Sequence, residues 1–165
     1  MKEPLLIVYY SLEGNTRFAC EQLEQAVPSV SARLIPDREP PRSGAGKFLK
    51  GGYSALKREK VILQPLAADP KAFSRLVLAC PVWAGTCPPA MHAFLAEAGL
   101  SGQRVWLLGT SMSGHTEKMF RTMKALLPSC EVAGALSLIS PLRDPERARA
   151  EILAFCEERG LARET

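Results

Sequence analysis

The sequence predicts an α/β protein: a three-layer, doubly wound, five-stranded parallel sheet in one domain spanning residues 1–165. Two observations predict this class. Short apolar runs alternate along the chain with segments in which apolar residues recur every three or four positions, the pattern of buried strands alternating with amphipathic helices. In addition, polar loops containing glycine follow three of these runs, and parallel sheets bind ligands in such loops at the carboxyl ends of their strands.

The five apolar runs are the predicted strands. The first and third are continuous and apolar, which is typical of strands covered on both faces. The second mixes serine and arginine with its apolar residues. In chain order the predicted strands are Leu5–Tyr10, Val30–Ile35, Leu76–Cys80, Val105–Leu108 and Val132–Ile139.

Four apolar stripes with helical spacing alternate with these strands. The first ends before Pro28, the second at Gly99, the third before Pro128 and the fourth before Gly160, because proline and glycine end helices. The stripes are Ala19, Leu23, Ala26 and Val27; Met91, Phe94, Leu95 and Ala98; Met119, Phe120, Met123, Leu126 and Leu127; and Ala148, Ile152, Phe155 and Cys156.

Residues 36–65 interrupt this alternation with an extended basic insertion between the second and third strands. The segment is rich in proline, glycine and cations, and loops of this length are usually functional or carry structure of their own. Apolar residues around Gly51 and Gly52 predict one or two short helices. The cations could dock an acidic partner or a 2′-phosphate; a solvated loop surface is the interpretation we favour.

The loop Ser11–Thr16 joins the first strand to the first helix and is a candidate anion site. Free backbone N–H groups and the helix dipole favour negative charge there, and Gly14 allows close approach of the backbone. The loop contains neither the GxGxxG dinucleotide motif nor the GxxxxGK[ST] Walker A motif. Without a ligand, Ser11 or Asn15 would be an ordinary helix cap.

Two further loops follow the third and fourth strands. In the first of them, the indole of Trp83 offers a large flat surface to an aromatic ligand; the alternative is that Trp83 is a core residue. In the second, Gly114 and small neighbours allow close approach. His115 could donate a proton or a hydrogen bond there, but we favour a solvent-exposed residue at a helix start.

The strand followed by the motif SxxGNT resembles the phosphate loop of flavodoxins and flavodoxin-like FMN-binding proteins. The resemblance covers nearly the whole chain and implies a flavodoxin-like fold with strand order 2-1-3-4-5 and FMN as cofactor. It departs from common flavodoxins in lacking an aromatic residue in the third loop. The implied cofactor-binding residues are Ser11, Leu12, Glu13, Gly14, Asn15, Thr16, Pro81, Val82, Trp83, Ala84, Gly85, Thr86, Thr110, Ser111, Met112, Gly114 and His115.

Composition excludes several other classes. Five scattered cysteines without a CxxC pair indicate reduced thiols, and two histidines without clustered acids do not indicate a metal site. The net charge of +4 is too small to favour nucleic acid. No apolar stretch is long enough for a signal peptide or a membrane span, so we expect a cytoplasmic protein without a membrane partner.

The leading functional interpretation is an FMN-binding electron-transfer protein of flavodoxin type, exchanging electrons with a redox partner protein or a small acceptor. One alternative is an enzyme, an NAD(P)H-dependent FMN quinone reductase. Another is a flavin-free interaction module with the same fold. No catalytic residue is predicted.

Overall fold

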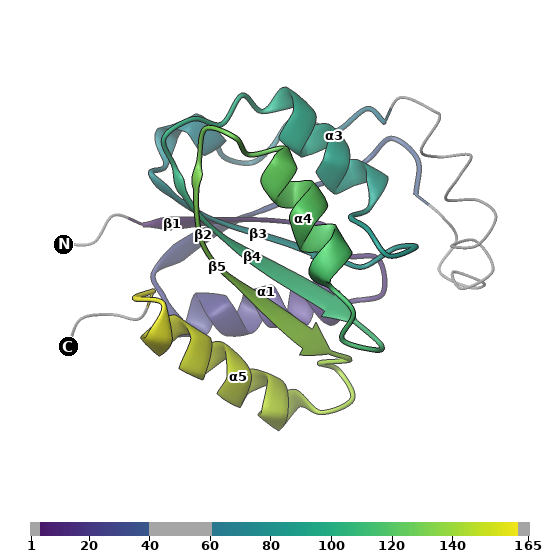
Figure 1. Cartoon of the computed structure of the whole chain (residues 1–165), viewed down its shortest axis with the longest axis vertical. Helices are drawn as coiled ribbons and strands as arrows, with labels where there is room; N and C mark the ends of the chain where they lie inside the picture. Colours follow the sequence, from purple (N-terminus) through teal and green to yellow (C-terminus); the bar gives the residue numbers. More distant parts are fainter. Residues whose placement is uncertain (1–3, 40–60, 162–165) are drawn as a thin grey trace.

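The computed structural model describes residues 4–39 and 61–161. Their centre is a five-stranded, all-parallel sheet with the order β2-β1-β3-β4-β5 (Figure 1). The predicted fold class and strand order are therefore confirmed. The strands are β1 (Leu5–Tyr9), β2 (Ser29–Arg33), β3 (Arg75–Pro81), β4 (Arg104–Ser111) and β5 (Glu131–Ile139).

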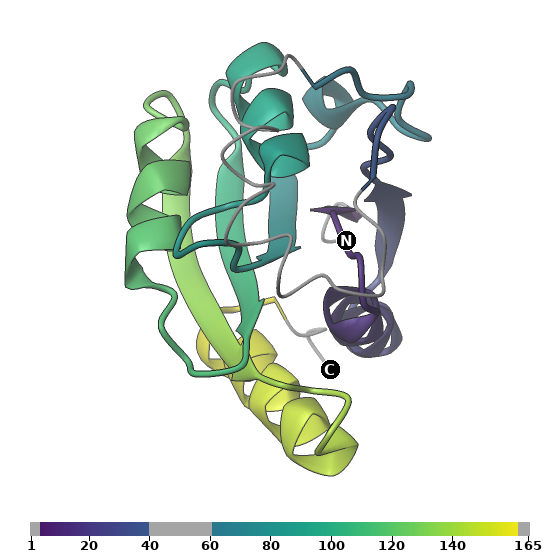
Figure 2. The same ribbon diagram turned by 90° about the vertical axis from the view of Figure 1, so that its right-hand side faces the viewer.

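Helices cover both faces of the sheet, α1 and α5 on one and α3 and α4 on the other (Figures 1 and 2). Local sequence explains where two of them begin. Proline occupies the first position of α3 and of α5, and the Asp144 side chain accepts the Arg147 N–H at the start of α5. The helices are α1 (Asn15–Ala26), α3 (Pro89–Glu97), α4 (Glu117–Ala125) and α5 (Pro145–Glu158), with a short 3₁₀ turn, η1, at Pro70–Ala72.

The core has two layers because neighbouring residues of a strand face opposite sides of the sheet. On β1, Leu6 and Val8 pack toward α3 and α4, whereas Leu5 and Ile7 pack toward α1 and α5. Gly109 in β4 lets α4 approach closely, since a Cβ there would lie 2.6 Å from the Met119 Cε. This packing fixes the position of α4 against the sheet.

Two features extend the sequence-based expectations. The structure carries β4 through Thr110 and Ser111, residues predicted as loop, because their backbones pair with the end of β5. The described ends of the insertion lie side by side, with Asp37 N–H donating to the Ile62 carbonyl and Gln64 N–H to Ile35. The short helices predicted within the insertion fall outside the described residues.

Crossing a bilayer requires a helix of about 20 mostly apolar residues. Along the described segments, no helix combines the length and the apolar character needed to cross a membrane.

Candidate functional site

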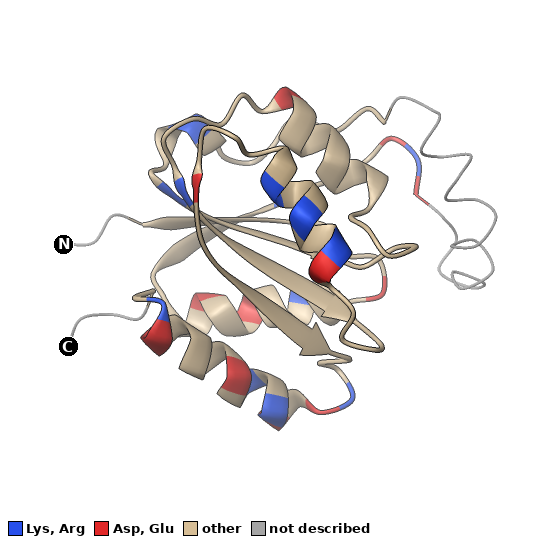
Figure 3. Ribbon diagram, viewed as in Figure 1, with Lys and Arg blue, Asp and Glu red and all other residues tan. Residues whose placement is uncertain are grey.

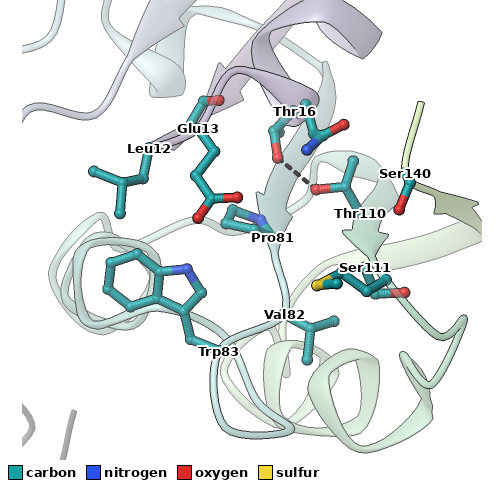
Figure 4. Close-up of a pocket in the computed structure, with 12 residues that line it drawn as sticks. Leu12, Glu13, Thr16, Pro81, Val82, Trp83, Thr110, Ser111 and Ser140 are labelled. Carbon is teal, nitrogen blue, oxygen red and sulfur yellow. Dashed lines mark hydrogen bonds between the residues drawn. The ribbon is translucent and has the colours of Figure 1, made fainter. Parts of the chain in front are cut away.

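A hollow lies at the carboxyl ends of β1, β3 and β4, beside the point where strand order reverses (Figure 4). Its cavity volume is about 210 Å³. Pockets that enclose a ligand fully are larger, on the order of 300–1,000 Å³, so a cofactor bound here would remain partly outside. The lining residues are Ser11, Leu12, Glu13, Asn15, Thr16, Pro81, Val82, Trp83, Thr110, Ser111, Met112 and Ser140.

The loop between β1 and α1 turns sharply into the helix at Gly14, whose φ of 100° favours glycine. The Gly14 carbonyl accepts the Phe18 N–H, the first bond of the helix. One residue before Phe18, the Arg17 N–H donates to the Ser11 Oγ over 3.2 Å. The N–H groups of Asn15 and Thr16 have no acceptor within the helix, because they belong to its first turn. They are available to an anion.

Two buried hydroxyls meet at the back of this loop. The Thr16 and Thr110 Oγ1 atoms lie 2.8 Å apart, and the side chains come from α1 and β4 (Figure 4). Both residues are buried and line the hollow. The arrangement concentrates hydroxyl donors beside the free N–H groups of α1.

A cation supports the first loop from the neighbouring strand. Arg33, at the end of β2, donates from Nη2 to the Ser11 carbonyl over 2.8 Å. A charged donor makes this bond stronger than a neutral one. Arg33 therefore holds the backbone of the loop and adds positive charge near the start of α1.

The second loop is a tight turn closed by its own backbone. Trp83 and Thr86 exchange two N–H···O bonds of 2.9 Å each, and the turn between them places Ala84 at φ 47° and Gly85 at φ 80°. Trp83 is 5% exposed, and its ring packs edge-on against Tyr10, with centroids 5.4 Å apart. Burial raises the pKa of the Tyr10 phenol, which therefore stays neutral beside the indole.

A hydrogen bond holds the third loop against the end of β4. The Ser111 Oγ accepts the Gly114 N–H over 2.8 Å, and Gly114 has a φ of 84°. Met112 lines the hollow and is 80% exposed, so it forms part of the mouth. His115 is exposed and does not line the hollow.

The structure brings most of the predicted cofactor-binding residues together at one hollow. The predicted residues that do not line it are Gly14, Ala84, Gly85, Thr86, Gly114 and His115. The first five shape the turns that carry lining residues, and their direct contact with a ligand stays a prediction.

Ser140 and Arg33 belong to the site and were not predicted from the sequence. Ser140 follows β5 at φ 40°, and its N–H donates to the Ser111 carbonyl. Its position directly after the fifth predicted strand could have indicated that Ser140 lies at the same edge of the sheet as the three loops. Arg33 gave no such signal, because an arginine inside a strand is ordinarily solvated.

Chemically, the first loop offers hydroxyls, N–H groups and a helix start, which together suit an oxyanion. The second and third loops offer apolar surface and backbone polar groups around it. Within residues 4–39 and 61–161, no three His, Cys, Asp or Glu side chains are grouped so that they could hold a metal ion.

Comparisons with known proteins agree with this architecture. No family model and no curated protein sequence matches the chain. Among solved structures, a protein from Bacteroides uniformis superimposes with a TM-score of 0.78 at 14% identity, covering 93% of this chain and 97% of that one. A flavoprotein from Lactobacillus acidophilus, solved in complex with FMN, gives 0.68 at 16% identity, covering 86% and 97%.

A flavodoxin from Fusobacterium nucleatum bound to flavin mononucleotide gives a TM-score of 0.58 at 13% identity, covering 94% of this chain and 95% of that one. Likeness at these identities establishes the fold. The chain has the flavodoxin-like fold, as the resemblance of its first loop implied.

Proposed function

We propose that the protein binds FMN in the hollow and acts as an electron carrier. The observation that supports this most strongly is the convergence of three loops on one site at the switch point of the sheet. One loop opens a helix and suits a phosphate; the other two surround it with apolar surface. Two of the structural neighbours are described as FMN-bound.

The phosphate of FMN would be bound at the start of α1. Asn15 and Thr16 would donate their backbone N–H groups, Ser11 its hydroxyl, and the bonded Thr16–Thr110 pair its one unused O–H hydrogen. These groups are fixed by bonds already present, so little ordering is needed on binding. FAD is not expected, because the site offers one phosphate cradle and no adenosine-binding fingerprint follows it in the sequence.

The flavin ring would be bound by the second and third loops. Pro81, Val82 and Met112 offer apolar contact, and Trp83 contributes the part of its ring that lines the hollow. Trp83 is held by Tyr10, so it would support the ring from a fixed position. With a cavity smaller than the ligand, part of the ring system would stay at the surface, where a second redox centre can approach.

When bound, FMN supplies one- and two-electron redox chemistry that no side chain in the hollow provides. The lining side chains would bind and orient it and limit access of water. A ring that stays partly at the surface suits exchange of electrons with another redox centre. We therefore propose exchange of electrons with a redox partner protein or a small acceptor.

We also propose that the protein works in the cytoplasm. All five cysteines are free, and Cys20, Cys80, Cys87 and Cys156 are buried. Free thiols persist in a reducing compartment.

The test is a visible spectrum of the purified protein, followed by titration of the flavin-free protein with FMN, riboflavin and FAD. One FMN per chain, bound more tightly than riboflavin or FAD, is expected. A chain that takes up no flavin would be an interaction module instead. Turnover of NAD(P)H with a quinone, without an added reductase, would make it an enzyme and contradict the carrier proposal.

A further inference from the structure

One side of α4 carries a row of cations. Lys118, Arg121 and Lys124 are exposed and spaced three residues apart, so they form a stripe about 9 Å long. Glu117 is the single carboxylate of this helix. None of the three cations is ion-paired with any residue in the described segments. Figure 3 shows these positions in blue along α4, and we refer to them as the basic stripe.

The helices on the opposite face of the sheet differ in this respect. On α1, Arg17 lies 3.1 Å from Glu21, and on α5, Arg147 lies 3.0 Å from Glu151. Figure 3 shows red and blue interspersed on α5. Local pairing therefore cancels charge on that face, whereas α4 keeps an excess of positive charge.

The basic stripe begins beside the second loop of the candidate site. The Lys118 Cδ lies 3.8 Å from the position a Cβ on Gly85 would take, so this side chain reaches the second loop. The Thr86 and Thr122 hydroxyls, 3.4 Å apart, connect the same loop to α4. The third loop runs directly into the start of α4. A molecule resting on the stripe would therefore reach the mouth of the hollow.

Three exposed apolar side chains lie on or beside the first and third loops of the site. Met112 is 80% exposed, Ile139 41% and Leu142 47%. The Ile139 side chain lies beside Gly114 of the third loop, and Leu142 lies beside Gly14 of the first. We call these three residues the apolar rim. Exposed apolar groups beside charged ones are typical of protein interfaces, which combine an apolar centre with a polar periphery.

We infer that the basic stripe and the apolar rim together dock an acidic electron-transfer protein over the hollow; this rests on the proposed function. Opposite charge would steer the partner to α4 and speed the encounter. The apolar rim would then exclude water where the two redox centres face each other. A protein fits this combination better than a nucleic acid does, because phosphates would leave the apolar rim without contacts.

The experiment follows electron transfer from the photoreduced, FMN-loaded protein to two probes by stopped flow. Oxidised cytochrome b5 is the acidic probe and cytochrome c the basic one. Two ferric haems each gain one electron for every flavin oxidised, and the protons are released to water. The test variant is Lys118→Glu, Arg121→Glu, Lys124→Glu. The control, called the α5 control, is Arg147→Glu and Arg149→Glu on α5 together with Arg159→Glu at the C-terminal cap of this helix, and it changes net charge equally.

At low ionic strength the α4 variant should transfer electrons to cytochrome b5 at least tenfold more slowly than the wild type. Its transfer to cytochrome c should be faster. The rates of the α5 control should differ from those of the wild type by less than threefold. Added salt should slow the wild-type reaction with cytochrome b5 and remove the difference between the variants. Equal effects of the α4 and α5 changes would overturn the inference. If the α4 variant fails to fold, the corresponding substitutions to glutamine should give a smaller effect of the same sign.

The flavin spectrum recorded before mixing separates this inference from the proposed function. A chain without bound FMN would contradict the proposed function alone, and docking would then be measured as binding of cytochrome b5 to the wild type and both variants. Loss of binding to anionic lipid vesicles by the α4 variant, with unchanged haem kinetics, would assign the stripe to a membrane surface and overturn the inference.

Discussion

The side-chain hydroxyls of Thr16 and Thr110 lie 2.8 Å apart, although 94 residues separate them in the chain. Their mutual bond ties the first turn of α1 to the end of β4. Two hydroxyls carry two hydrogens and this bond uses one, so one O–H hydrogen remains for a ligand. Because both residues line the hollow, the pair presents that donor beside the free N–H groups of α1.

Replacing Thr16 with valine should therefore weaken FMN more than riboflavin, which lacks the phosphate. A hydrogen bond to a charged group contributes about 1.5–3 kcal/mol, so the loss for FMN should be roughly tenfold or more. Fluorescence titration of the flavin-free protein measures both affinities. Thr110→Val, which leaves the Thr16 hydroxyl in place, is the matched control and should cost less. Equal losses for both ligands would show that Thr16 does not contact the phosphate.

Glu13 places a carboxylate among the residues that line the hollow, where it points toward Pro81 and Trp83 (Figure 4). An exposed carboxylate near a bound dianion is unfavourable by about 0.2–1 kcal/mol. Glu13→Gln should tighten FMN by up to about fivefold at low salt and leave riboflavin nearly unchanged. Glu146→Gln, an exposed position in the first turn of α5, serves as the control. Weaker FMN binding in Glu13→Gln would mean that the side chain holds the ligand.

Gly109 is required by packing. An added Cβ would lie 2.6 Å from the Met119 Cε and 3.1 Å from the Phe120 ring, so these two buried side chains would have to shift within the core. Gly109→Ala should lower the free energy of unfolding by about 1–3 kcal/mol, as overpacked cores do. At Gly134 the nearest atoms, at 3.2 Å, belong to the Arg159 side chain, which can turn away. Denaturant unfolding should therefore show a much smaller loss for Gly134→Ala; equal losses would refute the packing argument.

Buried thiols should make the protein less stable in alkali. Burial raises the pKa of Cys20 and Cys80 well above the usual 9.0 and that of Cys156 to about 11. Above pH 9 these thiols lose protons in the unfolded chain and keep them in the folded one, so stability falls as pH rises. Each thiol's contribution to the slope should approach about 1.4 kcal/mol per pH unit.

Urea unfolding at pH 8, 9 and 10 measures this slope, and the tyrosines begin to add to it as the pH approaches 10. Cys20→Ala removes one of the thiols and should make the decline shallower. A free energy of unfolding that stays constant from pH 8 to pH 10 would contradict the expected burial of the thiols.

Local patterns determined most of the fold. The continuous apolar runs around Ile7 and Leu78 predicted buried strands, and proline or glycine at the ends of the apolar stripes predicted where helices stop. The structure confirms those elements with shifts of a few residues at their ends. Thr110 and Ser111 were predicted as loop because their small polar side chains resemble turn residues. Pairing with β5 extends the strand through them, and no local pattern contains that information.

The sequence by itself also predicted the candidate anion site, because the order strand, Ser11–Thr16 loop, helix places free N–H groups and hydroxyls together within one turn. Only the tertiary structure decided the contacts between distant segments: the Thr16–Thr110 hydroxyl pair, the Arg33 bond to the first loop and the packing of Trp83 on Tyr10. It also decided that Lys118, the first cation of α4, reaches the second loop. Such contacts depend on which strands become neighbours and on how closely the helices pack against them, and neither is encoded in a short stretch of sequence.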